Sequence, residues 1–239
     1  MKIIGHRGAR NEAPENTLPS FIHAYQNQCR HFELDIQLSS DKELMVYHDK
    51  SLKRTSGINQ KLSNLPYGVL AKTDARLDTP GWPEPCYIPS LEKVFQAVPE
   101  TESWQFEVKT DRRDSLKIII DKLIPFIKSY DLYAKCHVTS TNKWFLKQLK
   151  LQAPRIRTGF VCEFLYQRPI STCLDIGADL LALNEKLASA KIVAQAQMKN
   201  IEISCWTINS IARIDQLLDL GIRSIITDVP SSMIRHYQL

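Results

Sequence analysis

Short runs of β-type residues recur along the whole 239-residue chain, and stretches with helical periodicity separate them. Alternating or continuous apolar positions predict strands at 2–6, 32–38, 43–48, 104–109, 135–140, 156–162, 179–184, 202–208 and 223–227. Apolar positions that recur every three or four residues predict helices at Thr17–Gln28, Ser90–Val98, Asp114–Tyr130, Asn142–Leu151, Glu163–Ile176, Lys186–Lys199 and Ile211–Leu220.

The order of these elements predicts an α/β fold with a parallel sheet. With the run 43–48 taken as a short accessory strand, eight β units remain, each followed by a helix or loop. Repeated βα units form parallel sheets, and eight of them fit a closed (β/α)₈ TIM barrel. A doubly wound open sheet is the alternative, but no glycine-rich phosphate loop follows the first strand. The segment 49–89 is rich in turn-forming residues and is predicted as a small irregular insertion after the second strand, within a single domain spanning 1–239.

Composition narrows the class of protein. Hydrophobic residues make up 44% of the chain and charged residues 24%, which is typical of a soluble globular protein. The net charge of +5 is spread along the chain and gives no case for a nucleic-acid surface. No apolar run approaches the roughly 20 residues of a membrane span, and the N-terminus lacks a signal-peptide pattern. The six cysteines form no Cys-x-x-Cys pair, so we expect free thiols and a cytoplasmic protein, whose oligomeric state stays unknown.

Two carboxylates share one face of the second predicted strand. Apolar and polar residues alternate strictly over 32–38, so Glu33 and Asp35 point the same way with their Cα atoms about 6–7 Å apart. Two carboxylates that point into a barrel repel each other unless a cation lies between them, and hard divalent cations prefer oxygen ligands. A solvated strand face is the plainer interpretation of such a pair.

A third carboxylate occurs in a matching context on the fourth run. In the sequence Trp104–Lys109, the residues Glu107 and Lys109 face opposite to Phe106 and Val108. Glu107 could therefore complete an oxygen cage with the earlier pair, and Lys109 could meet a phosphate oxygen. A simple Glu–Lys ion pair would produce the same pattern.

Two histidines and an arginine complete the set of candidate groups. His6 and His48 are both predicted at the C-terminal end of a strand, where the catalytic groups of (β/α)₈ enzymes gather. An unperturbed imidazole titrates near pH 6.5, so it can donate or accept a proton near neutrality. Arg7 carries a planar guanidinium that can hold a phosphate through two hydrogen bonds.

Nine short motifs occur in one order along the chain. They are His6-Arg7-Gly8, Pro14-Glu15-Asn16-Thr17, Glu33-Leu34-Asp35, His48-Asp49, Arg54-Thr55, Ile88-Pro89-Ser90-Leu91, Glu107-Val108-Lys109, Trp206-Thr207-Ile208-Asn209 and Ile226-Thr227-Asp228. In this order the chain resembles the glycerophosphodiester phosphodiesterase family from end to end. The resemblance implies a (β/α)₈ barrel that hydrolyses glycerophosphodiesters to sn-glycerol 3-phosphate and an alcohol with the help of Mg²⁺ or Ca²⁺.

The resemblance also implies a role for each matching residue. Glu33, Asp35 and Glu107 would be the metal ligands, and His6 and His48 the acid–base pair. Phosphate and substrate would contact Arg7, Lys109, Trp206 and Glu15, with Trp206 at the mouth of the site. The chain departs from the family pattern at Cys29-Arg30-His31 and at Ser210-Ile211, which changes loops rather than any implied catalytic group.

Several alternatives stay open at this stage. The attacking oxygen could belong to water or to the glycerol 2-hydroxyl, and either histidine could be the acid. A lysophospholipase D acting on lysophospholipids would use a similar site. A non-catalytic barrel that binds phosphate ligands is the third interpretation, although every catalytic position is filled.

Overall fold

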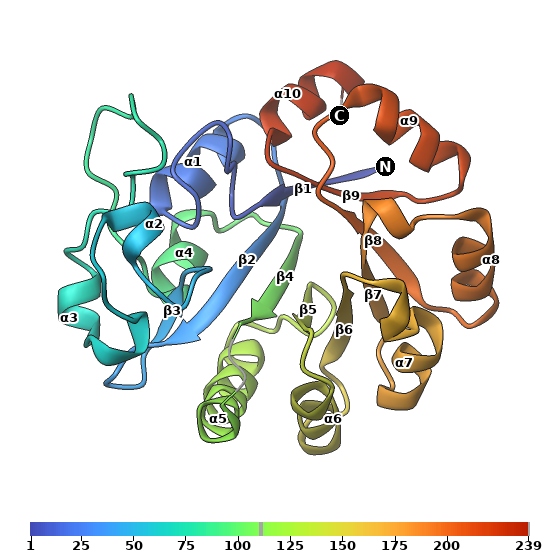
Figure 1. Cartoon of the computed structure of the whole chain (residues 1–239), viewed down its shortest axis with the longest axis horizontal. Coiled ribbons are helices and arrows are strands. Elements are labelled where there is room, and N and C mark those ends of the chain that lie inside the picture. The colour runs from blue at the N-terminus through green and yellow to red at the C-terminus, as the bar shows by residue number, and fades with distance from the viewer. Residues whose placement is uncertain (110–111, 239) are drawn as a thin grey trace.

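The computed structural model describes residues 1–109 and 112–238, and its strands close into a barrel surrounded by helices (Figure 1). The strands are β1 (Lys2–His6), β2 (His31–Leu38), β3 (Leu44–Val46), β4 (Ser103–Val108), β5 (Cys136–Ser140), β6 (Arg157–Cys162), β7 (Leu180–Asn184), β8 (Glu202–Trp206) and β9 (Ser224–Thr227). All except β3 are parallel, in the order β1-β9-β8-β7-β6-β5-β4-β2, and β2 pairs back onto β1. The predicted (β/α)₈ barrel is therefore confirmed.

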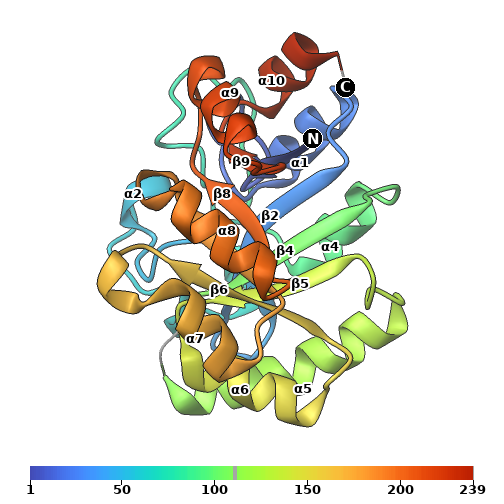
Figure 2. The same cartoon turned by 90° about the vertical axis from the view of Figure 1, so that its right-hand side faces the viewer.

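Helices cover the outside of the barrel (Figure 2). They are α1 (Leu18–Gln26), α2 (Lys53–Ser56), α3 (Tyr67–Leu70), α4 (Leu91–Ala97), α5 (Arg113–Ser129), α6 (Lys143–Gln152), α7 (Pro169–Ile176), α8 (Ala190–Met198), α9 (Ile211–Asp219) and α10 (Pro230–Tyr237). Three 3₁₀ turns join them in the described ranges, namely η1 (Leu62–Asn64), η2 (Leu165–Gln167) and η3 (Glu185–Leu187). None of the helices in the described part of the chain is long and apolar enough to cross a membrane.

Strand alternation separates the apolar core from the polar interior of the barrel. Phe32 on β2 and Trp104 on β4 pack with their ring centroids 5.5 Å apart, and Phe21 of α1 lies 5.6 Å from Phe32. All three rings are almost fully buried between the sheet and the helices. Glu33 follows Phe32 on β2, and Gln105 follows Trp104 on β4. Successive side chains of a strand point to opposite faces, so these polar residues point into the barrel. The outward apolar layer thus anchors the strands that carry the polar groups.

The insertion predicted at 49–89 contains α2, η1 and α3, and its apolar side chains pack with β3 and the residue after it in a cluster separate from the main core. The buried members of this cluster are Met45, Tyr47, Leu52, Leu62, Leu70, Ala75 and Ile88. The preceding strand β3 runs antiparallel to β2, with Ile36 opposite Val46 and Leu38 opposite Leu44. This hairpin returns the chain towards the middle of β2, and the insertion therefore begins beside the barrel interior.

Two predicted helices are shorter than their apolar patterns indicate. The helix predicted at 163–176 is divided, because Arg168 has a left-handed φ of 52° and precedes Pro169, which disfavours a helical residue before it. The helix predicted at 186–199 begins later, because the side chain of Ser189 caps α8 by accepting a hydrogen bond from the Ile192 amide. The strand predicted at 202–208 ends at Trp206.

The cysteine prediction is confirmed in the described residues. All six cysteines are buried free thiols.

Candidate active site

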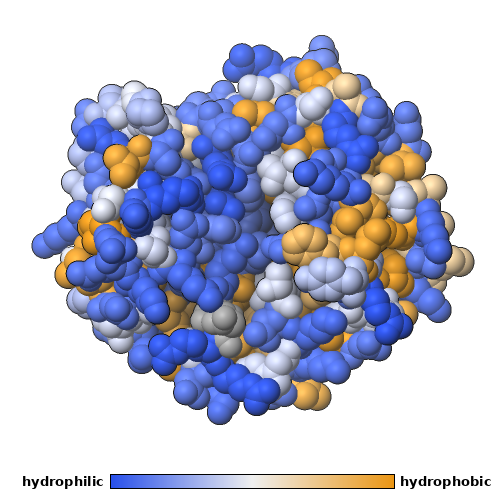
Figure 3. Space-filling view, viewed as in Figure 1, coloured by the Kyte–Doolittle hydropathy of each residue, from blue (hydrophilic) through white to orange (hydrophobic). Residues whose placement is uncertain are grey.

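A cavity of about 140 Å³ lies at the C-terminal ends of the barrel strands. His6 is the last residue of β1, Trp206 is the last residue of β8, and Lys109 directly follows β4. In Figure 3 the same face of the molecule is hollowed near its middle, and hydrophilic residues line the hollow. The sequence-predicted residues in the cavity wall are His6, Arg7, Glu33, His48, Glu107, Lys109 and Trp206.

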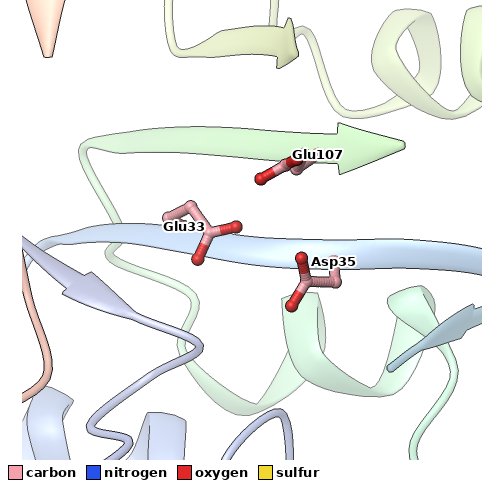
Figure 4. Close-up of side chains that lie close together, drawn as sticks. All are labelled: Glu33, Asp35 and Glu107. Carbon is pink, nitrogen blue, oxygen red and sulfur yellow. The ribbon is translucent and has the colours of Figure 1, made fainter. Parts of the chain in front are cut away.

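Three carboxylates meet at this end of the barrel (Figure 4). Glu33 and Asp35 project from β2, and Glu107 projects from β4, where it is in register with Asp35. One oxygen of each carboxylate lies within 4.8 Å of the others. Strand pairing therefore produces the acidic cluster that the alternation of β2 predicted, and it can accept a cation.

Burial makes this cluster electrostatically unusual. Burial and the neighbouring carboxylates of Asp35 and Glu107 raise the pKa of Glu33 well above its usual range. Burial opposes ionisation of Asp35 too, but the charges of Arg7 and Lys109 outweigh it and lower the pKa of Asp35. Among the described residues, neither Glu33 Oε1 nor Asp35 Oδ1 has a hydrogen-bond partner, although Lys109 Nζ lies 3.4 Å from Asp35 Oδ1. A buried carboxylate oxygen that accepts no hydrogen bond is costly, and coordination to a divalent cation would offset that cost.

His6 is held by a carboxylate from the far end of the chain. Its Nδ1 lies 2.5 Å from Oδ1 of Asp228, and Asn209 donates a 2.7 Å hydrogen bond to the other Asp228 oxygen. His6 Nε2 lies 3.8 Å from Oε2 of Glu33, inside the cavity. Burial lowers the pKa of His6, while the Asp228 carboxylate partly opposes that shift. A neutral imidazole with its Nε2 in the cavity is suited to accept a proton.

His48 has a similar partner closer in sequence. Its Nδ1 lies 2.6 Å from Oδ1 of Asp49, and Arg54 Nε donates to Asp49 Oδ2 at 2.8 Å. Burial lowers the pKa of His48. The prediction that His48 ends a strand is wrong, because β3 ends at Val46 and His48 lies in the loop that follows. The side-chain amide of Gln37 donates to the carbonyl of His48 at 2.9 Å and so ties this loop to β2.

Arg7 lies in a sharp turn at the end of β1. Its φ of 52° is left-handed, and its amide donates to the Glu33 carbonyl at 3.0 Å. Gly8 follows with a φ of 86°, and a Cβ there would lie 2.5 Å from Oγ of Ser20. The glycine lets the turn pack against α1, which leaves the Arg7 guanidinium in the cavity wall with its Nε 3.1 Å from Asp35 Oδ2.

Glu15 lies behind the cavity rather than in its described wall. Its Oε1 accepts a hydrogen bond from Arg7 at 2.8 Å and another from Arg54 at 2.7 Å. Arg10 Nε lies 3.1 Å from Glu15 Oε2. Burial opposes ionisation of Glu15, but the hydrogen bonds from Arg54 and the charge of Arg7 lower its pKa to about 2. Glu15 therefore links the arginine at the cavity to the arginine that holds Asp49.

Sequence reasoning assigned no role to the groups that orient the two histidines. Asp228 and Asp49 belong to motifs that were recognised, but their function depends on contacts with imidazole Nδ1 atoms. For Asp49 the adjacency to His48 was an available signal. For Asp228 the only signal was an acidic residue at the end of the last predicted strand.

The fold is a (β/α)₈ barrel, and the cavity lies at the C-terminal ends of its strands, where enzymes of this fold carry their catalytic groups. Residues 6–232 match the family model of the glycerophosphoryl diester phosphodiesterase family, and the chain belongs to that family. It is therefore a phosphoric diester hydrolase, which confirms the prediction of an enzyme.

Similarity to named relatives covers almost the whole chain. A glycerophosphodiester phosphodiesterase from Caldanaerobacter subterraneus is 26% identical over 97% of this chain and 96% of its own length. A lysophospholipase D from Rattus norvegicus is 25% identical over 96% of this chain and 84% of its own length. The solved structure of an Oleispira antarctica phosphodiesterase in complex with sn-glycerol 3-phosphate superposes with a TM-score of 0.87, at 19% identity over 100% of this chain and 97% of that one.

Proposed function

We propose that this enzyme hydrolyses glycerophosphodiesters to sn-glycerol 3-phosphate and an alcohol, with a divalent cation and a pair of histidines. The observation that carries the proposal is the convergence, at one end of the barrel, of a carboxylate trio and two imidazoles whose Nδ1 atoms are each paired with an aspartate. The Oleispira antarctica relative binds sn-glycerol 3-phosphate, which supports this product.

Glu33, Asp35 and Glu107 would hold the cation, Mg²⁺ or Ca²⁺. One oxygen of each lies within 4.8 Å of the others. Glu33 Oε1 and Asp35 Oδ1, which accept no hydrogen bond from any described residue, fit the ligand chemistry of a hard divalent ion. When bound, such an ion supplies Lewis-acid polarisation of a phosphate oxygen.

His6 and His48 would move the protons of the reaction. Pairing of each Nδ1 with an aspartate leaves Nε2 to exchange a proton with substrate. One imidazole removes the proton of the attacking oxygen, from water or from the glycerol 2-hydroxyl, and the other protonates the departing alcohol. Asp228 and Asp49 act as positioning residues, since each fixes the tautomer of its histidine.

Arg7 and Lys109 would bind the phosphate. Both are cations in the cavity wall, and each lies close to an Asp35 oxygen. Because they line the cavity, their charges would neutralise the negative charge that builds up on the phosphate oxygens. Trp206 is placed to pack against the glycerol carbons, and its Nε1 has no hydrogen-bond partner in the described ranges. Glu15 would hold Arg7 in position rather than touch the substrate.

A lysophospholipase D activity is the second candidate. It is supported by exposed apolar side chains beside the cavity, since Phe164, Leu165 and Tyr166 are 50%, 61% and 79% exposed and directly follow Glu163 in the cavity wall. Relatives of 25% identity carry that activity in their names.

We also propose that the protein is a single domain that works in the cytoplasm, where its buried free thiols stay reduced.

A coupled assay for released glycerol 3-phosphate tests the proposal. Purified protein is incubated with glycerophosphocholine or lysophosphatidylcholine, in EDTA and then with Mg²⁺ or Ca²⁺ restored. We expect glycerol 3-phosphate from glycerophosphocholine only when a cation is present. Activity that persists fully in EDTA contradicts the metal assignment, and faster choline release from lysophosphatidylcholine favours the second candidate.

A further inference from the structure

A groove of about 670 Å³ lies between α7 and α8 on the outside of the barrel, and its wall is mainly apolar. Three of its apolar side chains are more than half exposed, namely Leu165 at 61%, Leu174 at 51% and Met198 at 73%. In Figure 3 hydrophobic residues gather on the right of the face, where Figure 1 places α7 and α8. Single apolar side chains are common on protein surfaces, but a set that lines one groove indicates an interaction site.

The apolar surface continues onto η2, beside the candidate active site. Phe164 and Tyr166 are 50% and 79% exposed, and their rings stack with centroids 5.4 Å apart. Leu165 lies between them in sequence and lines the groove, whereas Glu163, just before them, lines the active-site cavity. The groove and the stacked pair therefore adjoin the active site. Their exposed apolar side chains are called the docking surface below: Phe164, Leu165, Tyr166, Leu174 and Met198.

Basic residues border the docking surface. Arg168, Lys191 and Lys199 line the groove, and all three are exposed. None of these side chains forms an ion pair with any residue that the structure describes. The described lining of the groove contains no acidic residue. The charge of the groove wall is therefore positive and uncompensated.

The acidic residues of the same stretch of chain do not cancel this charge. Asp179 pairs with Lys150 at 2.8 Å, and Glu185 pairs with Arg213 at 2.7 Å. Asp175 is exposed on α7 but is not among the residues that line the groove. The docking surface thus combines exposed apolar side chains with cations that have no partner of their own.

We propose that the docking surface binds the surface of a lipid bilayer that contains anionic lipids. Apolar side chains insert among the headgroups, while lysine and arginine beside them attract the anionic headgroups. A second copy of this chain fits less well, because a symmetric contact would bring the same unpaired cations together. Since Glu163 adjoins the docking surface, binding would place one wall of the active-site cavity near the membrane. The proposal goes beyond the proposed function, because binding to a bilayer requires no catalysis.

Co-sedimentation with vesicles tests the proposal in the absence of substrate. The protein is mixed with vesicles of phosphatidylcholine alone, or of equal parts phosphatidylcholine and phosphatidylglycerol. We expect binding to the mixed vesicles, weaker binding to phosphatidylcholine alone, and weaker binding to the mixed vesicles as the salt concentration rises.

Variants at the docking surface separate the two contributions. Lys191→Gln and Lys199→Gln should each weaken partitioning onto the mixed vesicles about fivefold, and Tyr166→Ser should weaken it about tenfold. All three side chains are exposed, so the variants should fold normally. The controls are Lys117→Gln on α5 and Leu151→Ser on α6, which remove exposed side chains outside the docking surface. Both controls should bind like the wild type.

Absence of vesicle binding, equal binding to both kinds of vesicle, or equal binding by the docking-surface variants and the controls overturns the proposal. A dimer in analytical ultracentrifugation that Tyr166→Ser dissociates also overturns it, because the docking surface would then belong to a second copy of the chain. Release of glycerol 3-phosphate has no part in this measurement, so failure of the hydrolase assay would overturn the proposed function alone.

Discussion

His6 and Asp228 are 222 residues apart in sequence, and the imidazole Nδ1 lies 2.5 Å from the carboxylate Oδ1. The contact forms because β1 and β9 are neighbours in the closed barrel, with Gly5 in register with Thr227. One end of the chain thus carries the imidazole, and the other end sets its orientation.

Replacement of Asp228 by asparagine should impair catalysis without unfolding the protein. The amide keeps the shape of the carboxylate but offers His6 a different hydrogen-bonding pattern, so the imidazole can adopt the wrong tautomer. We expect kcat to fall by about 10²–10⁴-fold with little change in KM and a shifted pH profile. Asp219→Asn, at an exposed position of α9, is the control and should retain full activity. An unchanged pH profile for D228N would contradict the positioning role.

The two histidines should differ in their response to the leaving group. His6→Ala and His48→Ala should each lower kcat for glycerophosphocholine by roughly 10²–10⁴-fold. A p-nitrophenyl ester of glycerol 3-phosphate needs no proton on its leaving group, so the variant that lacks the general acid should recover most of the lost rate on it. The variant that lacks the general base should not recover. Near-normal activity of either variant on glycerophosphocholine would remove that histidine from the mechanism.

Thermal unfolding should report cation binding independently of turnover. A ligand that binds only the native state at 100 times its Kd stabilises it by about 2.7 kcal/mol. We expect Mg²⁺ or Ca²⁺ to raise the Tm of the EDTA-treated wild type and to have a much smaller effect on Glu107→Gln. Glu43→Gln, which alters a surface pair with Lys122, should respond like the wild type. Equal shifts in all three proteins would place the cation elsewhere.

Glu15 should make stability depend on acid pH. Its pKa falls from 4.5 to about 2 in the folded protein, because the arginine contacts outweigh the effect of burial. Stabilisation by the carboxylate is therefore complete above pH 4.5 and is lost as the pH falls towards 2, with a total of roughly 3 kcal/mol. The free energies of unfolding of wild type and Glu15→Gln, measured from pH 6 to pH 3, should converge as the pH falls. Parallel curves would show that the carboxylate does not have this role.

A methyl group at Gly8 should destabilise the turn that carries Arg7. The added Cβ would lie 2.5 Å from Ser20 Oγ and 2.8 Å from the Ser20 carbonyl carbon, at a φ that favours glycine. We expect Gly8→Ala to cost about 1–3 kcal/mol, measured by denaturant unfolding. Gly68→Ala in α3 is the matched control, since a Cβ there has no neighbour within 4 Å among the described residues, and it should be neutral or slightly stabilising. Equal stability of the two variants would contradict this argument.

Much of the barrel could be predicted because its strands alternate strictly. In β2 the apolar positions Phe32, Leu34 and Ile36 pack outwards, which leaves Glu33 and Asp35 inside, as the pattern requires. The approach of Glu107 on β4 to the two carboxylates of β2 could also be predicted, since parallel strands have their C-terminal ends at the same edge of a sheet. These inferences need only local periodicity and the geometry of a sheet.

The histidine environments could not be obtained in the same way. The apolar run 43–48 is typical of a strand, but it does not reveal that β3 stops at Val46 and pairs antiparallel with β2. The same limit applies away from the site. Arg168 has a left-handed φ of 52° and separates η2 from α7, although the apolar pattern continues through it. Contacts such as His6–Asp228 depend on closure of the whole barrel, which no local pattern specifies.

The pairing of β1 with β9 has a consequence for biosynthesis. A ribosome releases His6, Arg7 and the carboxylates of β2 long before it synthesises Asp228. The nascent chain thus carries most of the reactive groups while the first imidazole still lacks its aspartate. Hydrolytic competence should therefore arrive abruptly, once β9 and Asp228 have been synthesised, and a message truncated before β9 should yield an inactive product.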